Sequence, residues 1–457
     1  MTIHRKTAII LTVTDRRNSR LSRFWQGVHR SIRWLYPGLG VKRWLLMLLA
    51  GITLVGVGLA IFLLDIYRTA PDTWWLPLLS LASLRFLARP LRVLIFGGLG
   101  VILIVVGIWG LNRSILKPFL RPGRAVVDQL AEYRRRERGP RVVAIGGGHG
   151  LSTLLRGLKE HTHNLTAVVT VADDGGSSGE LRRTMGILPP GDIRNCLAAL
   201  SNDEALLTQL FQYRFSGAPG LNGHSFGNLF ISALSDITGS FEEAIAESGR
   251  VLSVHGRVLP STLHNVKLVA DVRLPNTPNE VRVEGESRIP QIAGRVRRVW
   301  LEPNNAPAFP PVIQAILSAD VIVIGPGSLY TSILPNLLVP DLLAAVRVSR
   351  AVKFYICNIA TQPGETETYT CSDHVRALED HIGPGLVDVV ICNDTYEGKL
   401  TEGSQWVRVD EAARRDPRLY CTDLLDREHP WRHDSRRLAQ TIMDLYYERT
   451  GPLGERT

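Results

Sequence analysis

The stretch VVAIGGGHGLSTLLRGLKE, residues 142–160, decides the fold of this 457-residue chain. A short apolar run is followed by a glycine-rich loop and then by a helical pattern that starts near Leu151. Apolar runs at residues 165, 320 and 352 are also followed by helical patterns, and a last run begins at residue 387. Buried strands that alternate with helices indicate a parallel sheet covered on both faces. We therefore expect a doubly wound α/β domain, over residues 140–457, whose ligand lies where the strands end.

One segment of this domain has a different pattern. KLVADVRL, EVRVEGESRI and RVRRVWLEP, between residues 267 and 303, contain closely spaced strand-like runs without intervening helices. This pattern predicts a small antiparallel β insertion.

The N-terminal part contains two long uncharged runs, residues 45–64 and 93–111. About 20 apolar residues are needed to cross a bilayer, and neither run has the polar stripe of a buried soluble helix. We expect a transmembrane hairpin over residues 44–111, with spans at about 44–66 and 93–111. A basic cytoplasmic arm, residues 1–43, precedes it, and a basic juxtamembrane helix and linker, residues 112–139, follows it. Because basic loops stay inside, both termini and the C-terminal domain are expected on the cytoplasmic side of the cell membrane.

Charge supports this division of the chain. Residues 1–138 contain 22 Lys and Arg against 6 Asp and Glu, whereas the remainder has 31 against 37, so the net charge of +10 combines +16 with −6. The basic residues flank the predicted spans and lack a nucleic-acid-binding motif, so we expect anionic lipid and no nucleic acid as the partner. The five cysteines include no C-x-x-C pair, which predicts neither a disulfide framework nor a zinc ribbon and favours a reducing compartment.

The first strand leads into a loop that could cradle phosphate. Glycines let the backbone approach a phosphate, and the free N–H groups of a helix start attract its charge. The loop lacks the lysine of a P-loop, and a merely tight turn is the alternative. The candidate phosphate-binding residues are Gly146, Gly147, Gly148 and Gly150.

The second strand ends in two adjacent acids, Asp173 and Asp174, before another glycine-rich helix start. Such acids could hold a sugar hydroxyl or Mg²⁺, or could simply cap the helix. We name both as tentative catalytic residues and Mg²⁺ ligands, and Ser177 and Ser178 of the same loop as ligand-binding candidates.

Two further helix starts carry polar residues. In PPGDIRNCLAAL, Asp192 occupies an expected N-cap, and an arginine in the first turn, Arg194, opposes the helix dipole unless an anion or a carboxylate lies nearby. In LNGHSFGNLFISAL, His224 is the most plausible proton carrier. The other ligand-binding candidates of these two segments are Asn195, Ser225 and Asn228. Capping and buried, satisfied polar groups are the alternatives.

A second strand-to-helix loop, GPGSLYTS, starts at Gly325. Two phosphate loops in one sheet suit a ligand with several phosphates, and an aromatic residue could stack on its base or sugar. The candidates in this loop and at the end of the next strand are Gly325, Gly327, Ser328, Tyr330, Thr331, Asn358 and Gln362.

These motifs, in this order, closely resemble the gluconeogenesis factor (YvcK-like) family of the 2-phospho-L-lactate transferase (CofD-like) superfamily. The resemblance rests on GGGHGLSTLLRGLK, VTVADDGGSSGELRR, LPPGDIRNCLAAL, GHSFGNL, GPGSLYTSILPNLLV and TQPGET. It implies a Rossmann-like fold and a nucleotide ligand. In the transferase branch, a lactyl-phosphate unit moves from a guanosine diphosphate donor to a deazaflavin alcohol with Mg²⁺.

The branch that this chain resembles binds UDP-sugars and supports cell shape and envelope synthesis during gluconeogenic growth, without an established reaction. The resemblance thus implies a membrane-tethered regulator that binds UDP-N-acetylglucosamine, UDP-glucose or a related nucleotide, with Tyr330 at the UDP-sugar. A Mg²⁺-dependent phospholactate-type transferase and a non-enzymatic membrane scaffold are the alternatives. A homo-oligomer is compatible with each of them.

Overall fold

The computed structural model describes residues 134–451 apart from 202–203, 218–219 and 276–278, together with isolated positions between 49 and 105. The chain separates into two compact units, residues 1–134 and 135–457. The predicted arm, most of the hairpin and most of the linker lie outside the described residues, so the hairpin stays a prediction. The isolated positions described inside the two predicted spans are helical.

In the described part of the chain, no single helix is long and apolar enough to cross a membrane. One bent pair, Leu329–Leu337 with Pro340–Val348, reaches the required length and composition with a bend of 76°. Leu334, Leu337 and Leu342 of this pair are fully buried in the α/β domain.

The core of the second unit is a seven-stranded sheet with the order β10-β9-β8-β7-β1-β2-β3. All its strand pairs are parallel, and every residue of β1, β2, β7 and β9 is buried, because helices cover both faces. The strands are β1 (Val142–Gly146), β2 (Leu165–Val169), β3 (Arg257–Pro260), β7 (Val321–Ile324), β8 (Val352–Ile356), β9 (Val389–Asn393) and β10 (Leu419–Thr422). The predicted parallel α/β fold is confirmed.

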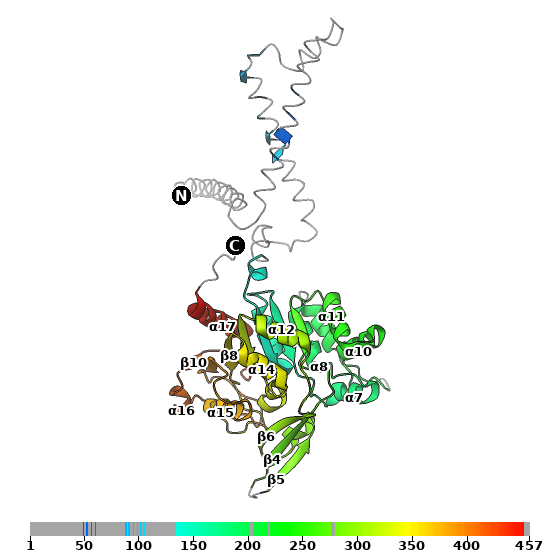
Figure 1. Ribbon diagram of the computed structural model, residues 1–457, viewed down its shortest axis with the longest axis vertical. Coiled ribbons are helices and arrows are strands. Elements are labelled where there is room, and N and C mark those ends of the chain that lie inside the picture. The colour runs from blue at the N-terminus through cyan, green and yellow to red at the C-terminus, as the bar shows by residue number, and fades with distance from the viewer. Residues whose placement is uncertain are drawn as a thin grey trace, which may run out of the picture. The chain divides into compact units, whose positions relative to one another are not determined.

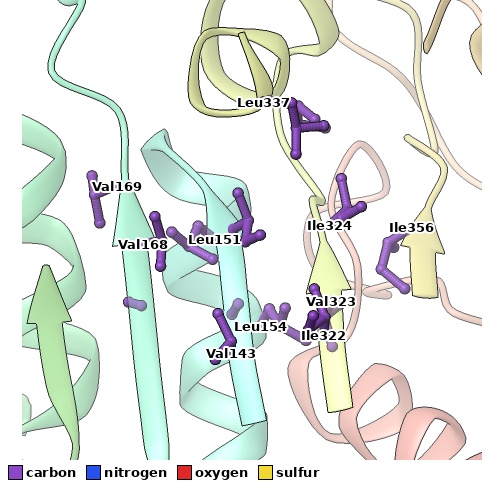
Figure 2. Close-up of a cluster of buried hydrophobic side chains, with 14 of the residues drawn as sticks. Val143, Leu151, Leu154, Val168, Val169, Ile322, Val323, Ile324, Leu337 and Ile356 are labelled. Carbon is purple, nitrogen blue, oxygen red and sulfur yellow. The ribbon is translucent and has the colours of Figure 1, made fainter. Parts of the chain in front are cut away.

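Two sets of helices pack around this sheet (Figure 1). In one set, α6 (Gly148–Leu158) contacts β1, β2, α8 (Gly191–Leu200) and α17 (Ser435–Thr450); in the other, α14 (Pro340–Val348) contacts α12 (Pro310–Ser318) and α13 (Leu334–Leu337). Figure 2 shows Leu151 and Leu154 of α6 among the valine and isoleucine side chains of β1, β2 and β7. The apolar face of α6 thus anchors the helix whose first turn follows the glycine loop.

The remaining helices lie between or after these elements. They are α7 (Gly176–Met185), α9 (Glu204–Gln212), α10 (Phe226–Thr238), α11 (Phe241–Val251), η4 (Leu329–Ile333), α15 (Cys371–Ile382) and α16 (Glu411–Arg414). Local signals mark several of their ends: Thr370 and Asp373 form a capping box at α15, and Gly239 ends α10 with a φ of 71°.

The predicted β insertion is also confirmed. Strands β4 (Lys267–Arg273), β5 (Glu280–Glu284) and β6 (Arg295–Glu302) form an antiparallel sheet with the order β5-β4-β6, and a 3₁₀ helix, η3 (Glu286–Gln291), connects β5 to β6. Leu268, Ala270 and Val272 of the central strand are fully buried on one face. The insertion projects from the larger domain (Figure 1), and η3 is the part of it that reaches the site described below.

The cysteines differ from the expectation. The structure joins Cys371, the first residue of α15, to Cys392 of β9 by a disulfide. The two residues are 21 positions apart in sequence, and sequence spacing could not show that their strand and helix ends meet. Cys196, Cys357 and Cys421 are free cysteines.

Candidate functional site

A cavity of about 630 Å³ lies where β1, β7 and β8 end. The strand order reverses between β1 and β7, and open α/β sheets bind ligands at this kind of switch point. The predicted site residues that line the cavity are Gly147, Gly148, Gly150, Asp173, Asp192, Gly327, Ser328, Thr331, Asn358 and Gln362. They come from five separate segments of the chain, which the parallel sheet brings to one edge.

The two glycine loops form one wall of the cavity. A Cβ on Gly150 would lie 2.5 Å from the carbonyl oxygen of Pro326, so only glycine permits the loops to pack this closely. The Gly327 N–H donates to Asn358 Oδ1 at 3.3 Å, and Gln362 Nε2 donates to the Ser328 hydroxyl at 2.6 Å. The wall is therefore held by the loop after β8 as well as by the glycines.

Gly146 and Gly325 were also predicted to bind ligand, but neither lines the cavity. The Gly146 carbonyl accepts a hydrogen bond from Asn336 Nδ2 at 2.9 Å, beneath the loop. Gly325 has a φ of 81°, a left-handed conformation that lets the chain turn at the end of β7. Both glycines shape the loops from below.

Acidic side chains occupy one part of the cavity wall. Asp173 and Asp192 were predicted; Glu286, from η3, was not. Burial raises the pKa of Asp192 to about 6, with a further contribution from the charge of Asp173. Burial, followed by the charges of Asp173 and Glu365, raises the pKa of Glu286 to about 8. Sequence reasoning missed Glu286 because the insertion lies more than 100 residues after Asp173 in the chain.

The two adjacent acids have different roles. Asp173 lines the cavity, whereas Asp174 Oδ1 accepts the N–H of Ser287 at 2.9 Å and so ties η3 to the loop after β2. In this geometry Asp173, and not its neighbour Asp174, lines the cavity where a metal or a substrate was expected. Adjacent residues in an extended loop point in different directions, so the sequence alone could not separate them.

The carboxylates that line the cavity suit Mg²⁺ only in a site that the ligand completes. Among the described residues, the sole group of three potential ligands within metal-binding reach is a cysteine cluster away from this wall, so the carboxylates do not form a complete cage. Mg²⁺ usually takes one or two carboxylates together with substrate phosphates and water. Asp173 and Asp192 could hold the ion in this manner, and the ion would neutralise phosphate charge.

Two buried oxygen atoms beside the cavity have no hydrogen-bond partner. The Thr331 hydroxyl donates to Glu365 Oε1 at 3.0 Å, but Glu365 Oε2 is unpartnered, as is Gln362 Oε1. Burial raises the pKa of Glu365 to about 7. Buried polar atoms are nearly always paired in folded proteins, so these two atoms indicate a place for a ligand donor or an ordered water.

A third part of the wall is formed by residues before α17: Trp431, Arg432 and His433. Burial and the charge of Arg432 lower the pKa of His149, which also lines the cavity. Burial lowers the pKa of His433 to about 4, and its Nε2 lies 3.2 Å from the Cys357 carbonyl oxygen, so it is a neutral donor. No glycine loop or strand end marks this segment, so its sequence did not predict a place in the site.

Seven predicted residues lie behind the cavity wall instead of on it. We call this group the rear cluster: Ser177, Ser178, Arg194, Asn195, His224, Ser225 and Asn228. All are buried and none lines the cavity. Asn228 Nδ2 donates to Ser177 and Ser178, and Arg194 donates to Ser225 and to Asn195 Oδ1. A hydrogen bond between Ser178 and Asp173 connects the cluster to the cavity.

His224 belongs to this rear cluster. Its Nδ1 lies 3.0 Å from the Ser177 hydroxyl, and its Nε2 lies 3.4 Å from a carboxylate oxygen of Glu180. It therefore does not reach the cavity as the expected proton carrier. Arg194, which the sequence placed at a helix start, donates to the buried side chains of Ser225 and Asn195 and does not line the cavity.

Tyr330 differs most from its expected role. Only 2% of its surface is exposed, and its hydroxyl lies 2.8 Å from that of Tyr369. Its ring also contacts His381 edge to face. Tyr330, a residue of η4, thus points into the core and does not line the cavity where it was expected to stack on a ligand.

Comparison with known proteins decides the family. The family of 2-phospho-L-lactate transferase CofD matches residues 142–425, and a relative from Nostoc sp. (strain PCC 7120) is 50% identical over 93% of this chain and 94% of its own. The Bacillus subtilis gluconeogenesis factor is 45% identical over 68% of this chain and 99% of its own. The chain belongs to the gluconeogenesis factor family, within the CofD-like superfamily.

A solved structure supports the family fold. The crystal structure of a UPF0052 family protein from Bacillus halodurans has 43% sequence identity and a TM-score of 0.63, covering 67% of this chain and 99% of that chain. Family members also differ in length. The Nostoc match extends well into the region before the α/β domain, whereas the Bacillus subtilis match covers about the length of the domain.

Proposed function

We propose that this protein is a membrane-tethered regulator that binds a UDP-sugar and supports cell shape and envelope synthesis during gluconeogenic growth. The observation that carries the proposal is the cavity at the switch point, where two glycine loops meet between an acidic and a cationic part of the wall. Its volume of about 630 Å³ is in the range of small-molecule sites.

The diphosphate would lie against the glycine loops. Helix α6 begins at Gly148, so its positive N-terminal end faces this part of the cavity. Arg432 supplies a full positive charge on the opposite segment. The unpartnered oxygens of Gln362 and Glu365 are acceptors for sugar or base N–H and O–H groups. Asp173 and Asp192 would contact sugar hydroxyls directly or phosphates through Mg²⁺.

The direct test is thermal melting of the full-length protein with UDP-N-acetylglucosamine, UDP-glucose, GTP or buffer. A ligand at 100 times its Kd stabilises the folded state by about 2.7 kcal/mol. We expect a raised Tm with at least one UDP-sugar and not with GTP. Unchanged Tm with both uridine nucleotides would reject the proposal.

Membrane tethering is a separate part of the proposal and needs its own test. We expect full-length protein in the membrane fraction of cells, resistant to extraction by high salt, and a variant lacking residues 44–111 in the supernatant. Release of the full-length protein by salt alone would show that the N-terminal part does not span the bilayer.

A second candidate function is a phospholactate-type transferase, favoured by the CofD match and by Asp173 in the cavity. The assay is product formation from a lactyl-phosphate guanosine diphosphate donor and a deazaflavin alcohol with Mg²⁺. Asp173→Asn should abolish turnover, while Asp174→Asn, whose side chain contacts Ser287 and does not line the cavity, should retain it. Recovery of both substrates unchanged by the wild-type protein would exclude this reaction.

A further inference from the structure

Three cysteines from different elements meet beneath the cavity. Cys357 follows β8, Cys392 lies in β9 and Cys371 begins α15. Their Sγ atoms all lie within 4.8 Å of one another, and all three residues are buried. Within the described ranges, no other group of three histidine, cysteine or acidic side chains is this compact. Three sulfur atoms bound to one ion at about 2.3 Å lie about 4 Å apart. Cys371 and Cys392 are joined as a disulfide, so their sulfurs reach this spacing only after that bond is reduced.

The disulfide accounts for only two of these sulfurs. Cys357 stays a free thiol beside the Cys371–Cys392 bond. The Cα atoms of the bonded pair are 7.0 Å apart, just beyond the usual range for disulfides, about 4.4 to 6.8 Å. A shared ion permits a wider Cα spacing, because two metal–sulfur bonds replace the single sulfur–sulfur bond between the side chains.

The surroundings can stabilise thiolates once an ion is present. Cys371 is the first residue of the 12-residue helix α15, whose N-terminal end favours negative charge. Burial raises the pKa of the Cys357 thiol well above its ordinary value, and the nearby carboxylate of Asp410 contributes to this shift.

We propose that, in the reduced protein, Cys357, Cys371 and Cys392 bind one thiolate-preferring metal ion, Cu⁺ or Zn²⁺. A dithiol reductant supplies two electrons and two protons to the Cys371–Cys392 disulfide, giving two thiols and an oxidised reductant. The ion then displaces one proton from each of the three thiols. Three thiolates alone suit Cu⁺, whereas Zn²⁺ would need a fourth ligand, so the two ions are distinguishable.

The position of the cluster suggests what the ion would hold. The residue after Cys357 is Asn358, which lines the cavity and accepts the N–H of Gly327. The Cys357 carbonyl oxygen is the partner of His433 Nε2. An ion bound here would join the end of β8 to β9 and to the start of α15, next to the residue whose side chain holds Gly327.

The experiment uses full-length protein reduced by a dithiol, freed from that reductant without oxygen and titrated with Cu⁺ or Zn²⁺ against a competing chromophoric chelator. We expect one ion per chain and at least a 100-fold loss of affinity in Cys357→Ser, Cys371→Ser and Cys392→Ser. Cys421→Ser is the matched control, because Cys421 is in register with Cys392 on the next strand but outside the cluster. Circular dichroism and size exclusion identify any variant that does not fold.

The wild-type protein decides the outcome even if a variant unfolds. Saturation at one ion, with protection of three thiols from alkylation, supports the site. The proposal is overturned if the reduced wild-type protein binds neither ion, or if Cys357→Ser binds the ion as tightly as the wild type. It is also overturned if Cys421→Ser loses as much affinity as the three cluster variants. None of these measurements uses the nucleotide, so they are independent of the proposed function.

Discussion

The cavity wall and the rear cluster look alike in the sequence but differ in the structure. Both draw polar residues from motifs near the starts of helices, with glycines and acidic residues in the wall and serine, asparagine, arginine and histidine in the rear cluster. Asp173 and Asp192 face a cavity, whereas His224 and Asn228 bond to Ser177, and Arg194 bonds to Ser225, behind it. A polar motif at a helix start therefore indicates the neighbourhood of a site, but not which residues contact the ligand.

The largest expected effect concerns stability. Arg194→Ala removes the donor to Ser225 and Asn195 and leaves buried polar groups without partners, so it should lower the free energy of unfolding by about 2 to 4 kcal/mol. Urea denaturation measures this loss. Arg214→Ala, an exposed arginine bonded to a backbone carbonyl, should change stability by less than about 1 kcal/mol. If Arg194→Ala kept normal stability but lost ligand binding, Arg194 would belong with the residues that contact the ligand.

Arg432→Ala should weaken ligand binding and leave the stability of the protein nearly unchanged. Loss of a charged partner for phosphate should raise the Kd for the UDP-sugar about 30-fold, corresponding to about 2 kcal/mol, with little change in the Tm of the free protein. Arg436→Ala, on the exposed first turn of α17, is the control and should bind normally. Isothermal titration would distinguish the two, and equal affinities would remove Arg432 from the site.

The acidic part of the wall predicts a pH effect. The pKa values of Glu365 and Glu286 are raised to about 7 and about 8, so these two groups hold more protons in the folded state than in the unfolded chain. Buried histidines such as His433, whose pKa is lowered from 6.5, act in the opposite direction at lower pH, so the effect of the two carboxyls is read between about pH 6.5 and pH 8. Stability should therefore fall as pH rises through this window, by up to about 1.4 kcal/mol per pH unit for each extra proton. Glu365→Gln should reduce the dependence of the free energy of unfolding on pH, as measured by urea denaturation at several pH values. A stability that rises over this window would contradict the assignment.

The smallest expected effect tests Tyr330. Tyr330→Phe removes the hydroxyl bond to Tyr369 and should cost about 1 kcal/mol of stability while leaving ligand affinity unchanged. Tyr369→Phe is a matched variant for the same bond. A clear loss of UDP-sugar affinity in Tyr330→Phe, without loss of stability, would restore the ligand role that the resemblance implied.

Regular elements with strong local patterns were predictable. The buried strands β1, β2, β7, β8 and β9 and the β insertion follow from apolar runs and their spacing. Two short edge strands, β3 and β10, were missed, because each has four residues and only partial burial. Such strands owe their conformation to pairing with a neighbour and carry little signal of their own.

Part of the site was predictable for the same reason. Gly147, Gly150 and Asp192 line the cavity because parallel strands deliver their ends to one edge of the sheet. Glu286 and Arg432 could not be found in this way, since one comes from the β insertion and the other from a loop before the last helix. Their contribution depends on contacts between segments more than 100 residues apart.

The sequence by itself determined the division of charge along the chain, the parallel α/β core, the antiparallel insertion and the loops around which a site would form. Only the tertiary structure decided which side chains face the cavity, that Asp174 ties the insertion while Asp173 faces the ligand space, and that three distant cysteines meet. Local patterns encode burial and hydrogen bonding within an element, whereas side-chain direction and proximity arise from packing between elements.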